Sequence, residues 1–575
     1  MIKVSNMSYS FPQKDLYKKV TFSIEEGQHC AFIGASGSGK STLIEMIMDT
    51  EKYLFDGEIE RDENLKIGFV SQFVEIKTEL SVFDYLAQDF IKAQARIDEI
   101  CKEMESGENI EKLLEDYQDA LDEFDSLDGD NYESNINKKI NLVNMDKNKS
   151  IKDLSGGELK LVQVAKEMLN NKDLMIMDEP DSFLDFDNLS SLKDLINSHK
   201  KTMIVITHSR YLLNHCFDKI IHLENAELQE FDGRYIEYNL GLLQSKIELQ
   251  ELSIKDEEEI QRNEDLIEKL RFRSTYNTDE SSGRALKARM KIKERLEERR
   301  IKAPFVYIKK PNITLSNENI IEDTIALKVD NYSVSFNESL LQNVSFEINS
   351  NEKVAIVGGN GLGKTTLLKA IYKNESDNIE INENMNVSYL SQNADEILNL
   401  ERTIFADFMD NFRNQDEIKR YILNYGFNEG ILNQKIGSLS GGEKTILQLA
   451  KVCANNSNML LLDEPTSHLD MYSQIALEES VKSYKGLILM ISHDYQFIVN
   501  TMDYVFLIED KTVRKVSMKK FKRMIYSKYF DRNYLEMEDA KKLLETKVEK
   551  ALMNVDFELA RKLSEELEEL IKTIK

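Results

Sequence analysis

The sequence predicts an α/β protein in which one domain occurs twice, with a long α-helical hairpin between the copies and a small helical extension after the second. The duplication rests on the stretch GASGSGKST at Gly34–Thr42, which recurs as GGNGLGKTT at Gly358–Thr366, with further motifs repeated behind each in the same order. The α/β class follows because an apolar strand pattern precedes each glycine-rich stretch and a helical pattern follows it. The hairpin follows from a charged, proline-free stretch between the copies.

Length and composition exclude several classes of protein. A chain of 575 residues exceeds what one hydrophobic core usually serves. With 41% hydrophobic and 31% charged residues, it is typical of a globular protein and not of a disordered chain. The four cysteines are far apart, which argues against a disulfide framework or a CxxC site and favours a cytoplasmic location. We expect neither a signal peptide nor a transmembrane helix, since no apolar run approaches the roughly 18 residues of a membrane span.

The repeated motifs divide the chain into parts. In both copies 24 residues separate the start of an LSGGE motif from the Asp of a DEP triplet, and 30 separate that Asp from a His. From an SQ pair to LSGGE the distance is 82 residues in the first copy and 47 in the second, which predicts an insertion in the first. The predicted parts are a first domain at 1–230 with a helical insertion at about 85–140, a linker with a basic tip at 231–322, a second domain at 323–515 and an extension at 516–575.

The glycine-rich stretches predict two phosphate-binding loops. Each follows an apolar strand and opens a helix, so backbone N–H groups and a helix N-terminus surround an anion. Lys40 and Lys364 are expected to neutralise the β and γ phosphates, and the hydroxyls of Ser41 and Thr365 to bind Mg²⁺. One such match can arise by chance, but two in register are far rarer. The loops comprise Gly34, Ala35, Ser36, Gly37, Ser38, Gly39, Lys40, Ser41 and Thr42, and Gly358, Gly359, Asn360, Gly361, Leu362, Gly363, Lys364, Thr365 and Thr366.

Pairs of acids predict the rest of the catalytic chemistry. LMIMDEP and MLLLDEP read as buried strands ending in two acids, of which Asp178 or Asp463 can hold the Mg²⁺ shell. Their neighbours Glu179 and Glu464 are then the candidate general bases. The candidates for orienting water and the γ-phosphate are His208 and His493, each after a further apolar strand. A lone His there is usually structural, but the identical spacing favours a role. Ser209 follows the first His where Asp494 follows the second.

The ordered motifs resemble those of the ATP-binding-cassette (ABC) ATPases, in which two cassettes pack head to tail. The resemblance covers both halves of the chain and implies ATP and Mg²⁺ as cofactors, with Gln72 and Gln392 at the metal shell. It implies that Ser155 and Gly157 cap the nucleotide on Lys364, and that Ser440 and Gly442 cap the one on Lys40. Phe11 and Phe336 match the aromatic residue that stacks on adenine, although packing in the core is an equally good interpretation.

The linker carries an uneven charge that the rest of the chain does not lead one to expect. Residues 251–270 hold eight acids and three bases, whereas 271–302 hold eleven bases and five acids, in a protein of formal net charge −27. The simplest interpretation is a solvent-exposed helix with ion pairs between its own side chains. The excess of six positive charges instead favours contact with RNA phosphates, because the acidic cassettes would avoid them. The candidates for this contact are Arg271, Arg273, Arg284, Lys287, Arg289, Lys291 and Lys293.

Together these features resemble the ABC-F family. Its members have tandem cassettes in one chain, no membrane domain, a charged helical linker and an insertion in the first cassette. DEPTSHLD at Asp463–Asp470 is close to the family's DEPTNHLD, whereas DEPDSFLD at Asp178–Asp185 departs from it at Asp181 and Phe183. The resemblance implies a monomeric chain with an intramolecular cassette dimer, which binds the ribosome near the exit site with its linker beside the P-site tRNA. The departures make unequal ATP turnover at the two sites plausible.

Several alternatives stay open at this point. The chain could be the motor subunit of an ABC transporter, although such a protein would not need a cationic hairpin between its cassettes. The scattered cysteines argue against the related ribosome-recycling ATPases, which carry an iron–sulfur domain. Within the ribosomal hypothesis, a housekeeping translation factor and a protector against antibiotics fit equally well. The amphipathic helices at the end of the chain are expected to pack on their own domain.

Overall fold

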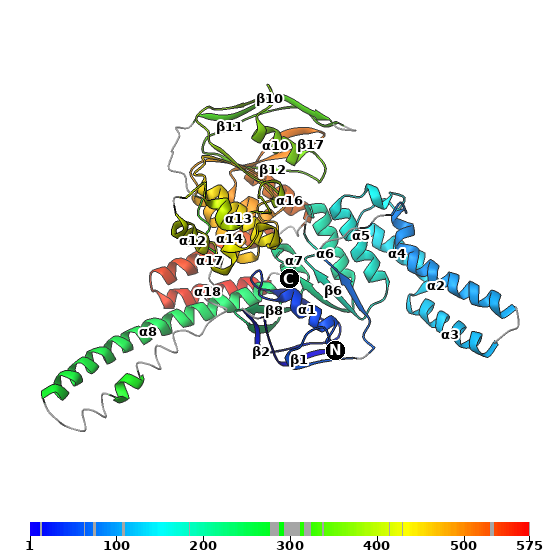
Figure 1. The fold of residues 1–575 in the computed structure, drawn as a ribbon, viewed down its shortest axis with the longest axis horizontal. Helices are drawn as coiled ribbons and strands as arrows, with labels where there is room; N and C mark the ends of the chain where they lie inside the picture. Colours follow the sequence, from blue (N-terminus) through cyan, green and yellow to red (C-terminus); the bar gives the residue numbers. More distant parts are fainter. Residues whose placement is uncertain are drawn as a thin grey trace. The chain divides into compact units, whose positions relative to one another are not determined.

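A computed structural model gives the architecture of most of the chain (Figure 1). Contacts divide it into two compact units, one of Met1–Glu230 with Lys310–Tyr529 and one of Phe231–Lys309 with Phe530–Lys575. The first unit holds both copies of the repeated domain, here called the first and second cassettes. The described residues are 1–11, 14–62, 64–72, 76, 78–105, 110–182, 184–276, 287–292, 311–315, 324–335, 339–412, 414–427, 429–529 and 534–573.

The first cassette is built on two sheets. The smaller is antiparallel, in the order β2 (Lys14–Ile24), β1 (Ile2–Phe11) and β4 (Asp56–Arg61). The larger has the order β5 (Ile67–Val70), β6 (Leu174–Asp178), β7 (Thr202–Ile206), β3 (His29–Ile33), β8 (Lys219–Glu224) and β9 (Glu227–Asp232). Neighbours from β5 to β8 are parallel. These strands are apolar at nearly every position because helices cover both faces of a parallel sheet.

The second cassette repeats this topology strand for strand. Its antiparallel sheet has the order β11 (Ser339–Asn349), β10 (Ile325–Ser335) and β13 (Ile379–Ile381). Its larger sheet has the order β14 (Val387–Leu390), β15 (Met459–Asp463), β16 (Leu487–Ile491), β12 (Lys353–Val357), β17 (Tyr504–Glu509) and β18 (Thr512–Ser517). The matching order confirms the prediction of a duplicated α/β fold.

Helices connect the strands and carry the repeated motifs at their N-termini. The pairs at equivalent places are α1 (Lys40–Met48) and α10 (Lys364–Lys373), α5 (Gly156–Leu169) and α13 (Gly441–Ala454), α6 (Phe186–Ser198) and α14 (Met471–Ser483), and α7 (Arg210–His215) and α15 (Tyr495–Thr501). Ser155 and Ser440 each begin their helix with a capping box to a Glu three residues on. The capping boxes therefore fix where the two LSGGE helices begin.

The two cassettes differ most between the SQ and LSGGE motifs. In the first, α2 (Val82–Glu105), α3 (Ile110–Ser126) and α4 (Tyr132–Leu142) occupy this stretch. The second has the shorter α11 (Ile404–Phe408) and α12 (Gln415–Asn424) there, together with short 3-10 helices. Figure 1 shows α2 and α3 side by side as an antiparallel pair. Their shared core includes Ile97, Ile100 and Ala120, so the insertion packs on itself.

The second unit is a small helical assembly. It contains α8 (Tyr235–Tyr276), α17 (Tyr534–Met553) and α18 (Phe557–Thr573), which lie together in Figure 1. Ile247 of α8 packs with Val548 of α17 and Ala560 of α18, and Leu240 packs with Leu567. The last two helices of the chain thus pack on α8 of the linker, an arrangement that our expectation did not include. After α8, the described residues of the predicted linker are a helical stretch at 287–292 and residues 311–315.

One further helix, α16 (Met518–Tyr529), follows β18 directly and packs on β17 and β18 in the first unit. The extension predicted from residue 516 therefore spans both units. In the described part of the chain, no helix has the length and apolar character needed to cross a membrane.

Candidate nucleotide-binding sites

The two glycine-rich loops join the central strand of each cassette to a helix. Gly39 and Gly363, just before α1 and α10, have φ of 104° and 87°, a backbone conformation that favours glycine. The Lys40 ammonium donates to the carbonyls of Gly34 and Ala35 at 2.8 and 3.0 Å. Lys364 does the same with its own loop at 2.9 and 2.7 Å. Burial lowers the pKa of both lysines because it removes water from the ammonium, and a bound phosphate would supply the counter-charge that favours the charged form.

Each loop is followed by a hydroxyl that meets the acid at the end of the neighbouring strand. Thr365 Oγ1 donates to Asp463 Oδ1 at 3.3 Å. In the first cassette, the Ser41 hydroxyl lies close enough to Asp178 to act against the rise in the pKa of its carboxyl. Burial raises the pKa of both acids. A hydroxyl and a carboxylate side by side are hard oxygen ligands of the kind that Mg²⁺ takes beside phosphate oxygens. These residues therefore fit the implied Mg²⁺.

The glutamates that follow differ in their surroundings. Glu179 and Glu464 both have positive φ, 46° and 49°, an unusual conformation that is often found at functional sites. Glu464 is buried, and that burial raises the pKa of its carboxyl to about 8. Its nearest partner is His493, whose backbone N–H donates to Glu464 at 3.2 Å. Glu179 instead accepts from Gln72 Nε2 at 2.6 Å.

The two histidines lie beside the loops. The His493 ring contacts Asn360 of the glycine-rich loop at 3.0 Å and lies 3.5 Å from Glu464. Burial lowers the pKa of His208 and His493 to about 3, so both rings are neutral at pH 7. His208 lies in the field of Lys40. The structure thus puts His493 next to the glutamate and the glycine-rich loop of its own cassette.

The Ser209 that replaces an Asp in the first cassette has a local explanation. Ser209 Oγ accepts from Leu212 N at 3.4 Å and begins α7, just as Asp494 accepts from Phe497 N at 3.0 Å and begins α15. Serine and aspartate are both good helix N-caps. This departure therefore concerns the helix start and not the histidine.

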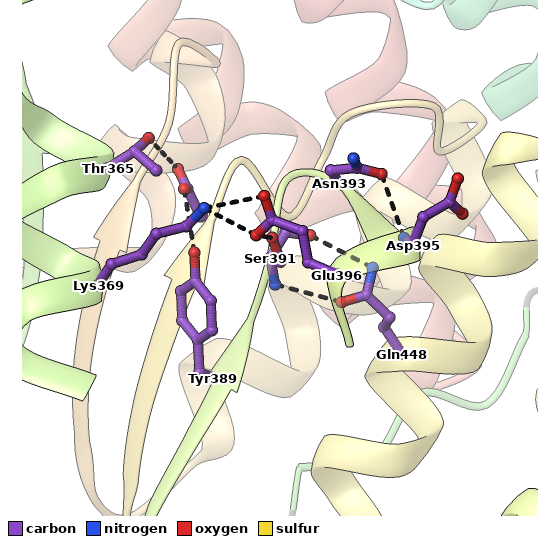
Figure 2. Close-up of polar contacts among 9 residues, drawn as sticks. Thr365, Lys369, Tyr389, Ser391, Asn393, Asp395, Glu396 and Gln448 are labelled. Carbon is purple, nitrogen blue, oxygen red and sulfur yellow. Dashed lines mark hydrogen bonds and ion pairs between the residues drawn. The ribbon is translucent and has the colours of Figure 1, made fainter. Parts of the chain in front are cut away.

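The SQ loops are held differently in the two cassettes. In the first, the Lys160 ammonium donates to the carbonyls of Ser71 and Gln72 at 2.6 and 2.7 Å. In the second, the side-chain amide of Gln448 accepts from Ser391 N at 3.2 Å and donates to Ser391 O at 3.3 Å (Figure 2). The structure brings Gln72 to Glu179, whereas Gln392 is exposed.

Two aspartates that we did not predict connect the cassettes. Asp470 Oδ2 accepts from Ser36 N of the first loop at 2.7 Å, and Asp185 Oδ2 accepts from Asn360 N of the second loop at 3.2 Å. The other oxygen of each carboxylate caps α14 or α6. A carboxylate oxygen on a loop N–H shows that the loops accept anionic oxygen. The signal in the sequence is the final Asp of DEPDSFLD and DEPTSHLD, which stands directly before a helix in both copies.

One LSGGE helix lies beside the loop of the other cassette. A Cβ added to Gly442 would lie 3.5 Å from Ser36 Oγ, so the segment of Ser440 and Gly442 lies beside the first loop. Gly157, which is equivalent to Gly442 in the first cassette, is buried.

The remaining predicted residues lie away from the contacts around the two loops, or outside the part of the chain that the structure describes. Phe11 ends β1, is 44% exposed and packs edge-on against Tyr9 at 5.3 Å, so it is available for stacking. Arg271 and Arg273 lie in α8, and the exposed side chains of the 287–292 helix include Lys287, Arg289 and Lys291. The predicted residues outside the described part of the chain are Phe336, Arg284 and Lys293.

Comparisons with known proteins follow the same division into two cassettes. The family model described as "ABC transporter" matches residues 17–182 and 341–467. ABC transporter F family member 2 of Arabidopsis thaliana is 31% identical over 541 residues, covering 88% of this chain and 76% of that protein. ATP-binding protein Uup of Escherichia coli (strain K12) is 27% identical over 530 residues, covering 88% and 80%.

Solved structures show the same fold. The complex of archaeal ribosomal stalk protein aP1 with ribosome recycling factor aABCE1 matches with a TM-score of 0.53 at 18% identity, over 91% of this chain and 92% of that one. A model of ribosome-bound archaeal Pelota and ABCE1 matches with a TM-score of 0.53 at 15% identity, over 91% and 80%. At these identities the likeness concerns the arrangement of two cassettes in one chain.

Proposed function

The chain belongs to the ABC-F family of ABC ATP-binding proteins, and from that premise we propose that it hydrolyses ATP at two composite sites to control its binding to the ribosome. The observation that carries the ATPase part is the reciprocal contact of the two aspartates. Asp470 reaches the first loop and Asp185 the second, so each site contains parts of both cassettes. A nucleotide bound at either loop would then favour the closed pair of cassettes.

The chemistry follows from the groups at each loop. Lys40 and Lys364 bind the β and γ phosphates, and the hydroxyl–carboxylate pairs of Ser41 with Asp178 and Thr365 with Asp463 hold Mg²⁺. When bound, Mg²⁺ neutralises charge that develops on the phosphate oxygens. Phe11 and Phe336 stack on adenine.

The glutamates are the general bases that activate the attacking water. Burial raises the pKa of Glu464 to about 8, so its carboxylate, once ionised, is a stronger base than an ordinary one. Its partner His493 orients the water and the γ-phosphate. Glu179 has the same position in the first cassette, and Gln72 holds it at 2.6 Å. The Ser and Gly of each LSGGE motif cap the nucleotide bound on the other cassette.

The ribosome part rests on the relatives and on the linker. A relative from the F family aligns along most of both chains, and the solved neighbours include a ribosome recycling factor and a ribosome-bound complex. The linker's basic side chains, Lys287, Arg289 and Lys291 among them, suit RNA phosphates. We place the protein in the cytoplasm, at the ribosomal exit site, with the linker beside the P-site tRNA. A transporter motor is less well supported, because its cassettes would have no use for this linker.

The test is ATP-dependent cosedimentation with ribosomes. The double variant Glu179→Gln, Glu464→Gln is expected to bind ATP without cleaving it and to stay on ribosomes, and its expression is expected to arrest growth. Repeating the assay with an antibiotic bound near the peptidyl-transferase centre separates a protector, which displaces the drug, from a housekeeping factor, which does not. Unchanged growth and no ribosome-bound fraction for the double variant would contradict the proposal.

A further inference from the structure

A second basic surface lies on the second cassette, far along the sequence from the linker. Residues 511–528 contain eight Lys or Arg and no Asp or Glu, in a chain of net charge −27. The stretch forms β18, which is the edge strand of the larger sheet, and then α16. It is therefore a fixed part of a folded cassette.

The helix turns its charges outward. Phe521, Ile525 and Tyr526 are buried against the cassette. Lys519, Lys520 and Arg523 are exposed, and their spacing of three and four residues puts Arg523 on the same face of the helix as both lysines. Lys511, at the turn before β18, is exposed as well.

Ion pairing explains only part of this surface. Arg514 pairs with Glu509 at 3.0 Å, Lys528 pairs with Asp187 at 2.5 Å, and the Lys515 ammonium lies 3.6 Å from the centre of the Tyr504 ring. Among the residues that the structure describes, no acid pairs with Lys511, Lys519, Lys520 or Arg523. These four cations face water.

The stability of the helix does not explain them either. Lys519 and Lys520 lie in the first turn of α16, where the helix dipole favours acids, and that turn contains none. Like charges three and four residues apart also repel, by about 0.2–0.5 kcal/mol per pair. The helix thus carries cations at positions that are unfavourable for its own formation, which points to a partner.

We propose that Lys519, Lys520 and Arg523 form a second RNA-binding surface that contacts the phosphate backbone of double-stranded RNA. This inference rests on the proposed ribosomal function and extends it from the linker to the second cassette. A row of exposed cations matches a phosphate backbone, which is bound by charge and shape and not by base sequence. The surrounding acidic protein would repel RNA elsewhere, so the surface also selects the face that docks.

The test compares two triple variants of the full chain. Lys519→Gln, Lys520→Gln, Arg523→Gln keeps good helix formers, and Lys547→Gln, Lys550→Gln, Lys562→Gln removes the same charge from exposed positions of α17 and α18. Binding to purified ribosomes and to a 24-base-pair RNA duplex is measured at several salt concentrations. The first variant is expected to bind both about tenfold more weakly, with a log–log salt slope smaller by about 2–3, because about three fewer phosphates are neutralised.

The outcomes separate this inference from the function on which it rests. The control variant is expected to bind like the wild type, and basal ATPase activity and melting temperature are expected to stay unchanged in both. An unchanged salt slope for the α16 variant would overturn the inference, as would loss of ribosome binding with unchanged duplex binding, since the partner would then be an acidic protein. If the wild type bound the duplex through α16 but did not bind ribosomes, the RNA-binding surface on α16 would be supported. The proposed ribosomal function would then be contradicted.

Discussion

The two candidate ATP sites come from one duplicated sequence, yet different side chains hold the SQ loop in the two cassettes. Lys160 and Asp181 of the first cassette stand where the second has Thr445 and Thr466. Lys160 is buried and donates to the backbone of the SQ loop, whereas Thr445 Oγ1 only donates to Gly441 O in its own helix, at 3.1 Å. A charged side chain has thus taken over a structural contact at one site only.

The two charges compensate each other. Burial raises the pKa of Asp181 to about 6 and lowers that of Lys160 to about 8, and each charge partly reverses the shift of the other. Gln163 occupies the position of Gln448, but its Oε1 is buried without a hydrogen-bond partner in the described part of the chain. The comparison teaches that the copies kept the same requirement, a fixed SQ loop, and met it with different chemistry. A charge-assisted contact is stronger than an amide pair.

The largest expected effect is the loss of ATP hydrolysis at one site when the glutamate of that site is replaced. Glu179→Gln and Glu464→Gln, made singly, are each expected to reduce hydrolysis at their own site by about 10²–10³-fold, because the general base is lost. Single-turnover assays that count the nucleotide hydrolysed per protein measure this. If the sites are independent, each single variant turns over one nucleotide and the double variant none. Complete loss of hydrolysis in both single variants would show that the two sites hydrolyse ATP only together. The two sites would then act as one catalytic unit.

The next effect tests the added charge pair. Lys160→Met leaves the Asp181 carboxyl buried without its cation and the SQ loop without two donors, so we expect a loss of about 1–3 kcal/mol in unfolding free energy. Hydrolysis at the first site should fall about tenfold. Urea denaturation gives the stability, and Lys160→Thr with Asp181→Thr, which copies the second cassette, should recover most of it. Thr445→Met is the matched control. Equal losses in Lys160→Met and the double variant would argue against coupling.

A smaller effect depends on pH. His199 of the first cassette stands where the second has Tyr484, whose hydroxyl donates to Ser457 O at 2.6 Å. Burial lowers the pKa of His199 from 6.5 to about 4, so the unfolded chain binds the extra proton first as the pH falls. The stability that a neutral His199 allows is present above pH 6.5 and is lost between about pH 6.5 and 4.

His199→Tyr should therefore flatten the decline in unfolding free energy over this window by roughly 1–2 kcal/mol, after allowance for partial exposure of the ring. Denaturation at pH 7.5, 6, 5 and 4 measures it. A parallel decline in the variant and the wild type would mean that other groups cause the acid sensitivity.

The smallest effect concerns the helix starts. Ser209→Asp gives α7 the cap that α15 has, and since the two residues cap equally well we expect a change within about 0.5 kcal/mol and unaltered ATP hydrolysis. Thermal melting and steady-state ATPase assays suffice. A large change in hydrolysis would show that the residue after His208 acts on the site and not only on the helix.

Much of the fold could be predicted because repeated motifs mark strand ends and helix starts directly. The glycine-rich loops, the acid pairs and the histidines come together as the strand order of an α/β sheet requires. Asp185 and Asp470 escaped prediction, because their role depends on a contact between cassettes that no local pattern encodes. Lys160 escaped because its helix position shows its function only once the SQ loop lies against it.

The C-terminal helices show a further limit of sequence patterns. Their amphipathic faces predict that they pack, but a hydrophobic stripe does not specify its partner. Ile247 and Val548, which meet in one core, are about 300 residues apart in the sequence. The basic face of α16 was not predicted for another reason. No sequence motif marks this helix, and the sequence alone does not show which of its charged side chains are exposed.

This pairing of α8 with α17 and α18 sets an order for folding. Each cassette can form from contacts within its own stretch of chain, but the core around Ile247 has to wait until the whole second cassette and the residues behind it have been synthesised. The apolar stripe of α8 is therefore uncovered while its partners are still being translated. The linker acquires its folded base last, so a chain interrupted within α17 would have two complete cassettes and no anchored linker between them.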